Sequence, residues 1–134
     1  MTTKTTQPKV TRKTTVIDAD GKVLGRIAAA AVKILMGKHR VDYSMHQDTG
    51  DYVEIKNVKL MKITGGNKMV QKEYMHFSQY PGGLKRSTLI DEMEKNPARV
   101  LRRAVVRMLP RNRLRDVRAH RLLIEGESKN KRLW

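Results

Sequence analysis

The chain has 134 residues, of which 29 are Lys or Arg and 13 are Asp or Glu, so its formal net charge is +16. This length suits a single domain with a modest core. The absence of cysteine excludes disulfides, cysteine-bound zinc and thiol catalysis. We find no apolar stretch long enough to span a membrane and no apolar signal core, so we expect an unexported protein. The usual partner of such a charge is a polyanion, most commonly nucleic acid, with a membrane surface as the second alternative.

The positive charge is concentrated at the two ends of the chain. Residues 1–15 carry +4, residues 16–97 carry +3 and residues 98–134 carry +9. Nine arginines and no lysine lie between Arg99 and Arg121. An arginine guanidinium bonds phosphate oxygens bidentately and stacks on bases, whereas lysine is a hydrated point charge. This choice of residue favours a phosphate-binding face over a merely solvated basic face.

The N-terminal part of the sequence predicts an arm, a strand and a helix. Residues 1–13 are basic, rich in Thr and without periodicity, which indicates a flexible arm. Thr14–Asp18 is a β-branched run that predicts a strand. Apolar residues at helical spacing predict a helix over Leu24–Met36, and Gly37 stands where a C-cap glycine belongs. A strand, a tight turn and a helix open a βαβ unit.

The middle of the chain alternates polar loops with short apolar runs. Residues 38–51 form a polar loop, and Tyr52–Lys56 and Leu60–Thr64 are predicted strands. Alternation over Val70–Phe77 suggests a further strand, and the composition of Gln79–Lys85 indicates a loop. A short helix is then predicted from Ser87, its N-cap, to Glu94.

The C-terminal part predicts a second amphipathic helix. It runs from Ala98 to Leu109, with Pro97 in its first turn, and Pro110 ends it. Arg99, Arg103 and Arg107 recur every four residues along it. The expected apolar side consists of Leu101, Ala104, Val105 and Met108. Residues 111–121 are Arg-rich with only a weak helical pattern, and Leu122–Glu125 is a predicted strand. We expect one α/β domain over residues 14–126, followed by a basic tail over 127–134.

One cluster raises the alternative of a small enzyme. His46, Asp48, Asp51 and Glu54 lie within nine residues, and a histidine with carboxylates can ligate a metal or transfer protons. Their spacing matches no ligand motif, and Asp-rich loops usually serve turn formation. We therefore favour a structural loop, with no catalytic residue, metal or cofactor.

Two glycine-containing segments are candidates for phosphate or RNA contacts. Gly21–Arg26 lacks the spacing and the Lys-Ser/Thr of a Walker motif, so Gly25 is interpreted as permitting close helix packing and Arg26 as an exposed basic contact. Tyr80–Arg86 is a better candidate, because its two glycines allow close backbone approach beside two cations. Nearby aromatics are suited to stacking on unpaired RNA bases. The alternative for this segment is a mobile loop.

Several segments resemble, in order, one protein family. They are VIDA at 16–19, GKVLGRIA at 21–28, GKH at 37–39, DTGDYV at 48–53, ITG at 63–65, YPGGLK at 80–85 and AVVRMLP at 104–110. The chain thereby resembles the bacterial branch of the universal large-subunit ribosomal protein thirteen family, over about residues 14 to 126.

The resemblance implies a fold, a function and a set of contacts. The implied fold is a three-layer α/β/α domain around a mostly parallel four-stranded sheet, to which the strand at 122–125 returns late. The implied function is structural: binding large-subunit ribosomal RNA beside neighbouring ribosomal proteins and supporting early subunit assembly, in the bacterial cytoplasm. By matching position, the contacts include Arg26, Lys38, His39, Lys85 and Arg107, which replaces the family's usual glycine.

The composition and the resemblance together define the expected RNA-binding residues. They are Lys9, Arg12, Lys13, Arg26, Lys38, His39, Arg40, Tyr80, Gly82, Gly83, Lys85, Arg86, Arg99, Arg103, Arg107, Arg111, Arg113, Arg115, Arg118 and Arg121. No membrane partner and no small-molecule substrate are expected. The competing hypothesis within nucleic-acid binding is a free regulator that acts on DNA or messenger RNA.

Overall fold

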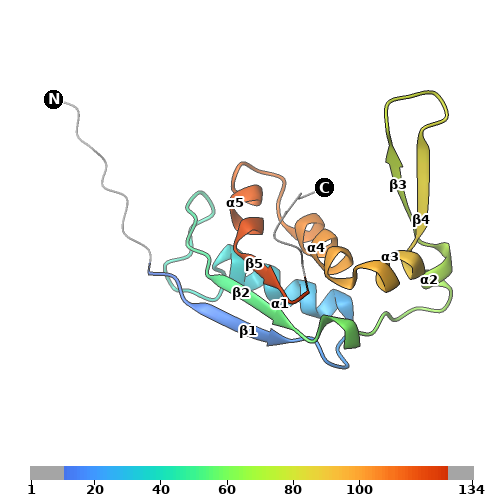
Figure 1. Ribbon diagram of the computed structural model, residues 1–134. Coiled ribbons are helices and arrows are strands. Elements are labelled where there is room, and N and C mark those ends of the chain that lie inside the picture. The colour runs from blue at the N-terminus through green and yellow to red at the C-terminus, as the bar shows by residue number, and fades with distance from the viewer. Residues whose placement is uncertain (1–10, 127–134) are drawn as a thin grey trace.

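A computed structural model describes residues 11–126, and Figure 1 shows how the elements are arranged. Most of the predicted arm, residues 1–10, and the whole predicted tail, residues 127–134, lie outside the described residues. The elements follow in the order β1 (Thr14–Asp18), α1 (Leu24–Met36), β2 (Tyr52–Lys56), η1 (Val58–Leu60), α2 (Lys68–Gln71), β3 (Glu73–Phe77), β4 (Leu84–Thr88), α3 (Leu89–Lys95), α4 (Pro97–Met108), α5 (Leu114–His120) and β5 (Leu122–Ile124).

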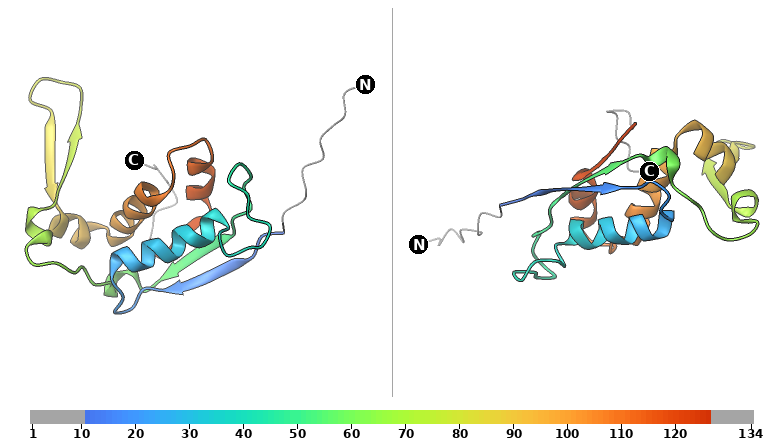
Figure 2. Two further views of the ribbon diagram at one scale, coloured as in Figure 1. Left: turned by 180° about the vertical axis from the view of Figure 1, so that it is seen from behind. Right: turned by 90° about the horizontal axis from the view of Figure 1, so that it is seen from below.

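Three parallel strands form the main sheet, in the order β1-β2-β5. Parallel neighbours require crossover connections, which α1 and the segment containing α3, α4 and α5 supply. Figure 2 shows α1, α4 and α5 on one face of this sheet. Val53, Ile55 and Leu122 are fully buried in the core. The predicted α/β class with a parallel sheet is therefore confirmed.

The expected four-stranded sheet and three-layer architecture are not confirmed in residues 11–126. β3 and β4 pair antiparallel in a separate hairpin, which projects from the rest of the structure (Figure 1). Alternate side chains of a strand point to opposite faces. On the outer face of the sheet, Val16 is 53% exposed and Leu123 is 42% exposed, so this face is open in the part of the chain that the structure describes.

The strand predicted over Leu60–Thr64 is wrong. The chain leaves β2 through Asn57, which has a positive φ of 57°, and enters the 3-10 turn η1. Only one parallel bridge, between Val23 and Lys62, follows. The apolar alternation arises because Val58 and Met61 are buried in the core, not because the segment joins a ladder.

The hairpin begins later and its loop is shorter than predicted. Residues 68–71 form α2, so the strand expected from Val70 begins at Glu73. The loop expected up to Lys85 ends earlier, because Leu84 pairs with Phe77 in the ladder. Helical and strand periods are hard to distinguish in apolar runs this short.

Helix α3 begins two residues after the predicted start, and Thr88 is its N-cap in place of Ser87. The Asp91 amide donates to the Thr88 hydroxyl at 3.3 Å, and the Thr88 amide donates to the Asp91 carboxylate at 3.1 Å. This reciprocal pair is a capping box, which satisfies two amides that the helix leaves unpaired. Ser87 is the last hairpin residue but one and pairs with Tyr74.

The core lies between the sheet and the packed helices α1 and α4. Ile27 and Leu35 of α1 and Leu101 and Val105 of α4 are buried to within 1%. The buried face of α4 is rotated from the predicted one, since Met108 is 47% exposed. Val100 and Val106 are buried in its place. The weak pattern after Pro110 does form a helix, α5.

Candidate nucleic-acid interface

The arginines of α4 divide between the surface and the interior. Asn96 caps the helix by accepting a hydrogen bond from the Arg99 amide at 3.1 Å, and Pro97 occupies the first turn. Arg99 and Arg107 are exposed, and Arg103 is half-buried. Arg102 is 3% exposed and donates to the carbonyls of Ala119, at 3.1 Å, and Leu122, at 2.8 Å. Thus Arg102 links α4 to the end of α5 and to β5.

Arg103 stacks on an aromatic ring of the hairpin. Its guanidinium carbon lies 4.3 Å from the centroid of Tyr74, and Lys72 Nζ lies 5.8 Å from the same ring. Such cation–π contacts hold the two cationic side chains in place without neutralising their positive charges. Burial raises the pKa of Tyr74, and the positive charges of Arg103 and Arg107 partly oppose this shift. The base of the hairpin is thereby joined to the basic side of α4.

The hairpin tip presents an exposed aromatic residue and two cations. Tyr80 is 74% exposed, and the Gly83 amide donates to its carbonyl at 2.9 Å. A Cβ on Gly83 would lie 2.0 Å from Ser78 Oγ and 2.9 Å from the Tyr80 carbonyl oxygen, so a larger residue here would shift the tip, and neighbouring Gly82 has a φ of +73°. Lys85 and Arg86 are exposed in β4. Because they are adjacent in a strand, their side chains point to opposite faces of the hairpin.

The loop over residues 38–51 is organised around the carboxylate of Asp51, which is buried. The Lys13 amide donates to its Oδ1 at 2.9 Å, and His39 Nε2 lies 2.8 Å from Oδ2. Arg40 donates to both oxygens. Burial raises the pKa of Asp51, but hydrogen bonds from Lys13, Arg40 and His39 outweigh it and lower the pKa overall. His39 and Arg40, both predicted RNA contacts, thus also stabilise the fold.

A second carboxylate, that of Asp48, contacts three arginines, which come from both ends of the chain. Arg121 bonds both of its oxygens, and Arg118 Nε and Arg12 Nη2 each lie 3.5 Å from it. Burial raises the pKa of Asp48, but the hydrogen bond and charge of Arg121, with Arg118 and Arg12, lower it overall. Arg118 is 1% exposed and Arg121 5%. The sequence pattern placed these two with the surface arginines, whereas their guanidinium groups face Asp48 and main-chain carbonyls.

The same contacts explain the cluster that suggested an enzyme. Asp48 and Asp51 are bound to cations from the chain itself, and His46 is exposed. Within residues 11–126, no group of His, Asp and Glu side chains is arranged to hold a metal ion. Gly50 fits the structural interpretation, because a Cβ there would lie 1.8 Å from the Leu35 carbonyl oxygen. The cluster orders the loop against the end of α1.

The other predicted residues lie mostly at the surface. Those classed as exposed are Arg12, Lys13, Arg26, Lys38, His39, Arg111 and Arg113. Arg115 is half-buried and lies 3.5 Å from Asp116. Lys9 lies outside the described residues. Arg12 and Lys13 precede β1, Lys38 and His39 open the loop after α1, and Arg111 and Arg113 lie between α4 and α5.

Two lysines near α4 were missed by the sequence analysis. Lys68 is the first residue of α2 and Lys72 is its C-cap; both are exposed, and Lys72 approaches Tyr74. Their spacing of four residues is a helical signal. This signal was missed because the alternation of apolar and polar residues over Val70–Phe77, which includes Lys72, predicts a strand.

None of the helices within residues 11–126 has the length and apolar character that crossing a membrane requires. The sequence model of the ribosomal protein L13 family matches residues 12–130. The large ribosomal subunit protein uL13 of Thermotoga petrophila is 51% identical over 112 residues, which cover 84% of this chain and 74% of that protein. The same-named protein of Thermoanaerobacter sp. strain X514 is 46% identical, covering 92% of this chain and 85% of its own. That of Aquifex aeolicus is 48% identical, covering 86% and 76%.

These matches extend over the strands, loop, hairpin and helices described above. The family is one of structural ribosomal proteins. This agrees with the role of Asp48 and Asp51, whose carboxylates bind arginines of the chain and do not form a reaction centre. The chain belongs to the ribosomal protein L13 family.

Proposed function

We propose that this chain binds large-subunit ribosomal RNA as a structural component of the bacterial large ribosomal subunit and supports early subunit assembly. Its partners are that RNA and neighbouring large-subunit proteins, in the cytoplasm. The expected fourth strand and third layer belong to the same proposal: the strand would pair at an edge of the sheet, beside β1 or β5, and the third layer would pack on its open outer face.

The observation that supports RNA binding is that some arginines are buried in ion pairs while others are exposed. Arg118 and Arg121 are buried against Asp48, whereas Arg99, Arg107, Arg111 and Arg113 are exposed and form no ion pair within residues 11–126. Like charges on one helix face repel each other. A phosphate backbone would neutralise them, and phosphate contacts made by a rigid surface position a protein on a folded RNA.

The proposed contact set keeps the predicted residues that are not fully buried. It consists of Arg12, Lys13, Arg26, Lys38, His39, Arg40, Tyr80, Gly82, Gly83, Lys85, Arg86, Arg99, Arg103, Arg107, Arg111, Arg113 and Arg115, with Lys9 from outside the described residues. The proposal leaves out Arg118 and Arg121, because exposing either would break its bonds to Asp48 and leave a buried charge unpaired.

Sedimentation tests this function directly. A tagged chain expressed in bacteria is expected to co-sediment with large subunits in a sucrose gradient at moderate salt. Recovery solely in the free soluble fraction would refute the proposal.

Binding assays separate it from a free DNA-binding regulator. Large-subunit ribosomal RNA should bind more tightly than duplex DNA of equal length. With roughly eight phosphate contacts, the plot of log affinity against log salt should have a slope of about −6 to −7. Equal affinity for both nucleic acids would favour the regulator.

A further inference from the structure

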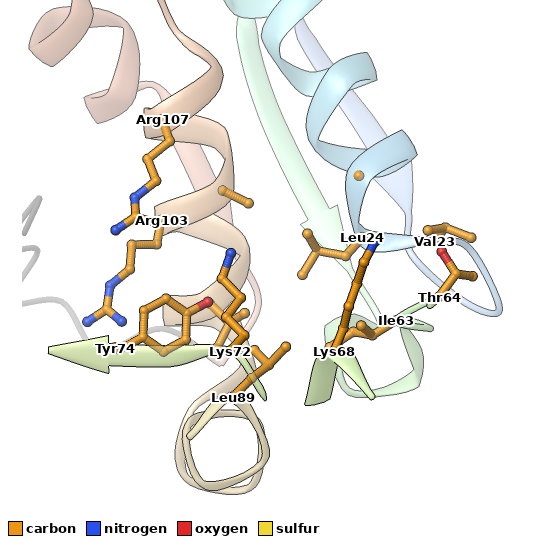
Figure 3. A pocket seen from close by; sticks show the side chains of 13 residues that line it. Val23, Leu24, Ile63, Thr64, Lys68, Lys72, Tyr74, Leu89, Arg103 and Arg107 are labelled. Carbon is orange, nitrogen blue, oxygen red and sulfur yellow. The ribbon is translucent and has the colours of Figure 1, made fainter. Parts of the chain in front are cut away.

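A cavity of about 270 Å³ lies between the start of α1, residues 63–64, the α2 segment and α4. Figure 3 shows it from close by: Arg103 and Arg107 extend from α4 on one side, with Tyr74 below them, and Lys68 rises toward Leu24 on the other. Pockets for drug-sized ligands measure roughly 300–1,000 Å³. The size therefore suits one planar group of the order of a nucleobase.

The walls of the cavity are apolar and its cations have no acidic counterpart. Leu24, Ile63, Leu89 and Val100 line it, together with Tyr74. The same lining contains Lys68, Lys72, Arg103 and Arg107 and no Asp or Glu. An apolar interior with a cationic lining matches the two halves of a nucleotide, the flat base and the anionic phosphate.

One donor in this lining is unsatisfied. Arg103 Nη1 is buried and has no hydrogen-bond partner within the described residues, although the guanidinium stacks on Tyr74. A buried donor without an acceptor costs roughly 1–3 kcal/mol. The atom is closed to solvent here, so a base or phosphate oxygen can accept from it once the Arg103 side chain turns toward the cavity.

Gly25 keeps one wall of the cavity open. It lies in the first turn of α1 and lines the cavity, yet a Cβ added there would meet no atom within 4 Å. The expectation that this glycine permits close helix packing is therefore wrong. Glycine destabilises a helix by roughly 0.5–1 kcal/mol relative to alanine. Neither packing nor backbone conformation requires it here, and what its missing side chain provides is space in the cavity.

We propose that this cavity binds one unpaired nucleotide, with the base between the apolar walls and the phosphate held by Lys68, Lys72 and Arg107. The inference rests on the proposed function for the source of the nucleotide, a looped-out position of large-subunit ribosomal RNA. Unpaired RNA bases are splayed out and stacked on protein side chains in this manner. A free mononucleotide presents the same base and phosphate as a looped-out RNA nucleotide, and the experiments below distinguish these two sources.

The test fills the cavity without changing its charge. Gly25→Leu places a side chain into the open space, and Gly66→Leu is the matched control, because a Cβ on Gly66 also meets nothing within 4 Å and Gly66 does not line the cavity. Thr64→Phe adds bulk from an exposed lining position and serves as a second filling variant if Gly25→Leu does not fold. Thermal unfolding checks that each variant is folded.

The full-length chain and its variants are titrated with large-subunit ribosomal RNA, with base-specific chemical probing of the complex. We expect about tenfold weaker binding for the filled cavity, in line with the loss of one stacked base. One nucleotide that is protected by the wild type and by Gly66→Leu should become reactive with Gly25→Leu, while the rest of the footprint persists. An unchanged affinity and footprint would overturn an RNA source for the nucleotide, yet leave the proposed function standing.

A second titration tests whether the cavity binds a free mononucleotide. The free protein is titrated with AMP, UMP and inorganic phosphate, and binding is followed by NMR. Binding of a mononucleotide that Gly25→Leu abolishes, without any effect on RNA binding, would assign the cavity to free nucleotides. Absence of both effects would refute the proposal. If the wild type does not prefer ribosomal RNA over DNA, the proposed function is contradicted. The mononucleotide titration then still tests whether the cavity binds a nucleotide.

Discussion

Asp48 and Asp51 show how single residues determine what the arginines around them do. Asp51 joins the base of the N-terminal arm, through the Lys13 amide, to His39 and Arg40 of the loop. Asp48 joins Arg12 to α5 and its C-cap. Two carboxylates thus tie together segments that are far apart in the sequence, and they neutralise cations that would otherwise repel.

The first prediction removes the charge of Asp48. Asp48→Asn should lower the free energy of unfolding by about 3 kcal/mol, because it leaves the buried guanidinium groups of Arg118 and Arg121 without their anion. Urea denaturation at neutral pH measures this change. Asp42→Asn, at an exposed position of the same loop, is the control and should stay within about 0.5 kcal/mol of the wild type. An equal effect of both substitutions would show that the ion cluster adds nothing.

The second prediction concerns pH. The folded-state pKa values of Asp48 and Asp51 are lowered, so both groups stabilise the fold above their unfolded pKa of about 4, and this contribution is lost as pH falls through the folded values. Urea denaturation between pH 7 and pH 2.5 should show stability declining below about pH 5. Asp51→Asn should give a flatter curve over this acidic range. A decline of the same steepness would contradict the assignment.

At the scale of the element, α4 packs one side against the core and exposes the other, which is proposed to contact RNA. The double variant Arg99→Glu/Arg107→Glu is expected to reduce the salt slope of RNA binding by about 2, since each exposed arginine is proposed to contact one phosphate. Its thermal stability should match that of the wild type, because both side chains are exposed. Arg103→Glu should instead cost stability as well, because it removes the contact with Tyr74.

A matched charge reversal tests whether position matters or only net charge. Lys59→Glu changes an exposed lysine on η1, outside the proposed contact set. It should affect RNA affinity much less than reversal of Arg107 does. If all reversals weaken binding equally, the protein attracts RNA by its overall charge and α4 has no special role.

The tip of the hairpin depends on the small size of Gly83. Gly83→Val forces a Cβ into Ser78 Oγ and the Tyr80 carbonyl, so the tip must rearrange. A two-stranded hairpin has little stability of its own. We expect faster amide hydrogen exchange in β3 and β4, unchanged exchange in β2, and weaker RNA binding. Gly66→Val is the control, and loss of protection throughout the sheet would show that the hairpin is not an independent unit.

The sequence predicted the elements whose periodicity is strong and missed those decided by tertiary contacts. The boundaries of α1 and β2 were correct because a full amphipathic stripe or a buried run defines each. Leu60–Thr64 was wrongly predicted as a strand, since Val58 and Met61 are buried by the core and not by a strand ladder. For the site, charge density located the arginine-rich segment. It did not distinguish Arg118 from Arg113, because only the fold brings Asp48 to Arg118.

At the scale of the whole molecule, the buried ion clusters and the exposed cations make stability and binding interdependent. The free chain carries a net charge of +16, which opposes compactness through self-repulsion. A polyanion that binds only the folded state raises stability by mass action. We therefore expect large-subunit ribosomal RNA to slow amide hydrogen exchange in α4 and in the loop around Asp51, and to do so less as salt increases. The variant Arg99→Glu/Arg107→Glu should retain the protection near Asp51 but lose most of it in α4, because both substituted residues lie on α4 and neither contributes to the bonds of Asp51 with Lys13, His39 and Arg40. Loss of protection in α4 and in the loop together would mean that the RNA engages them as one cooperative surface and not as two separate contacts.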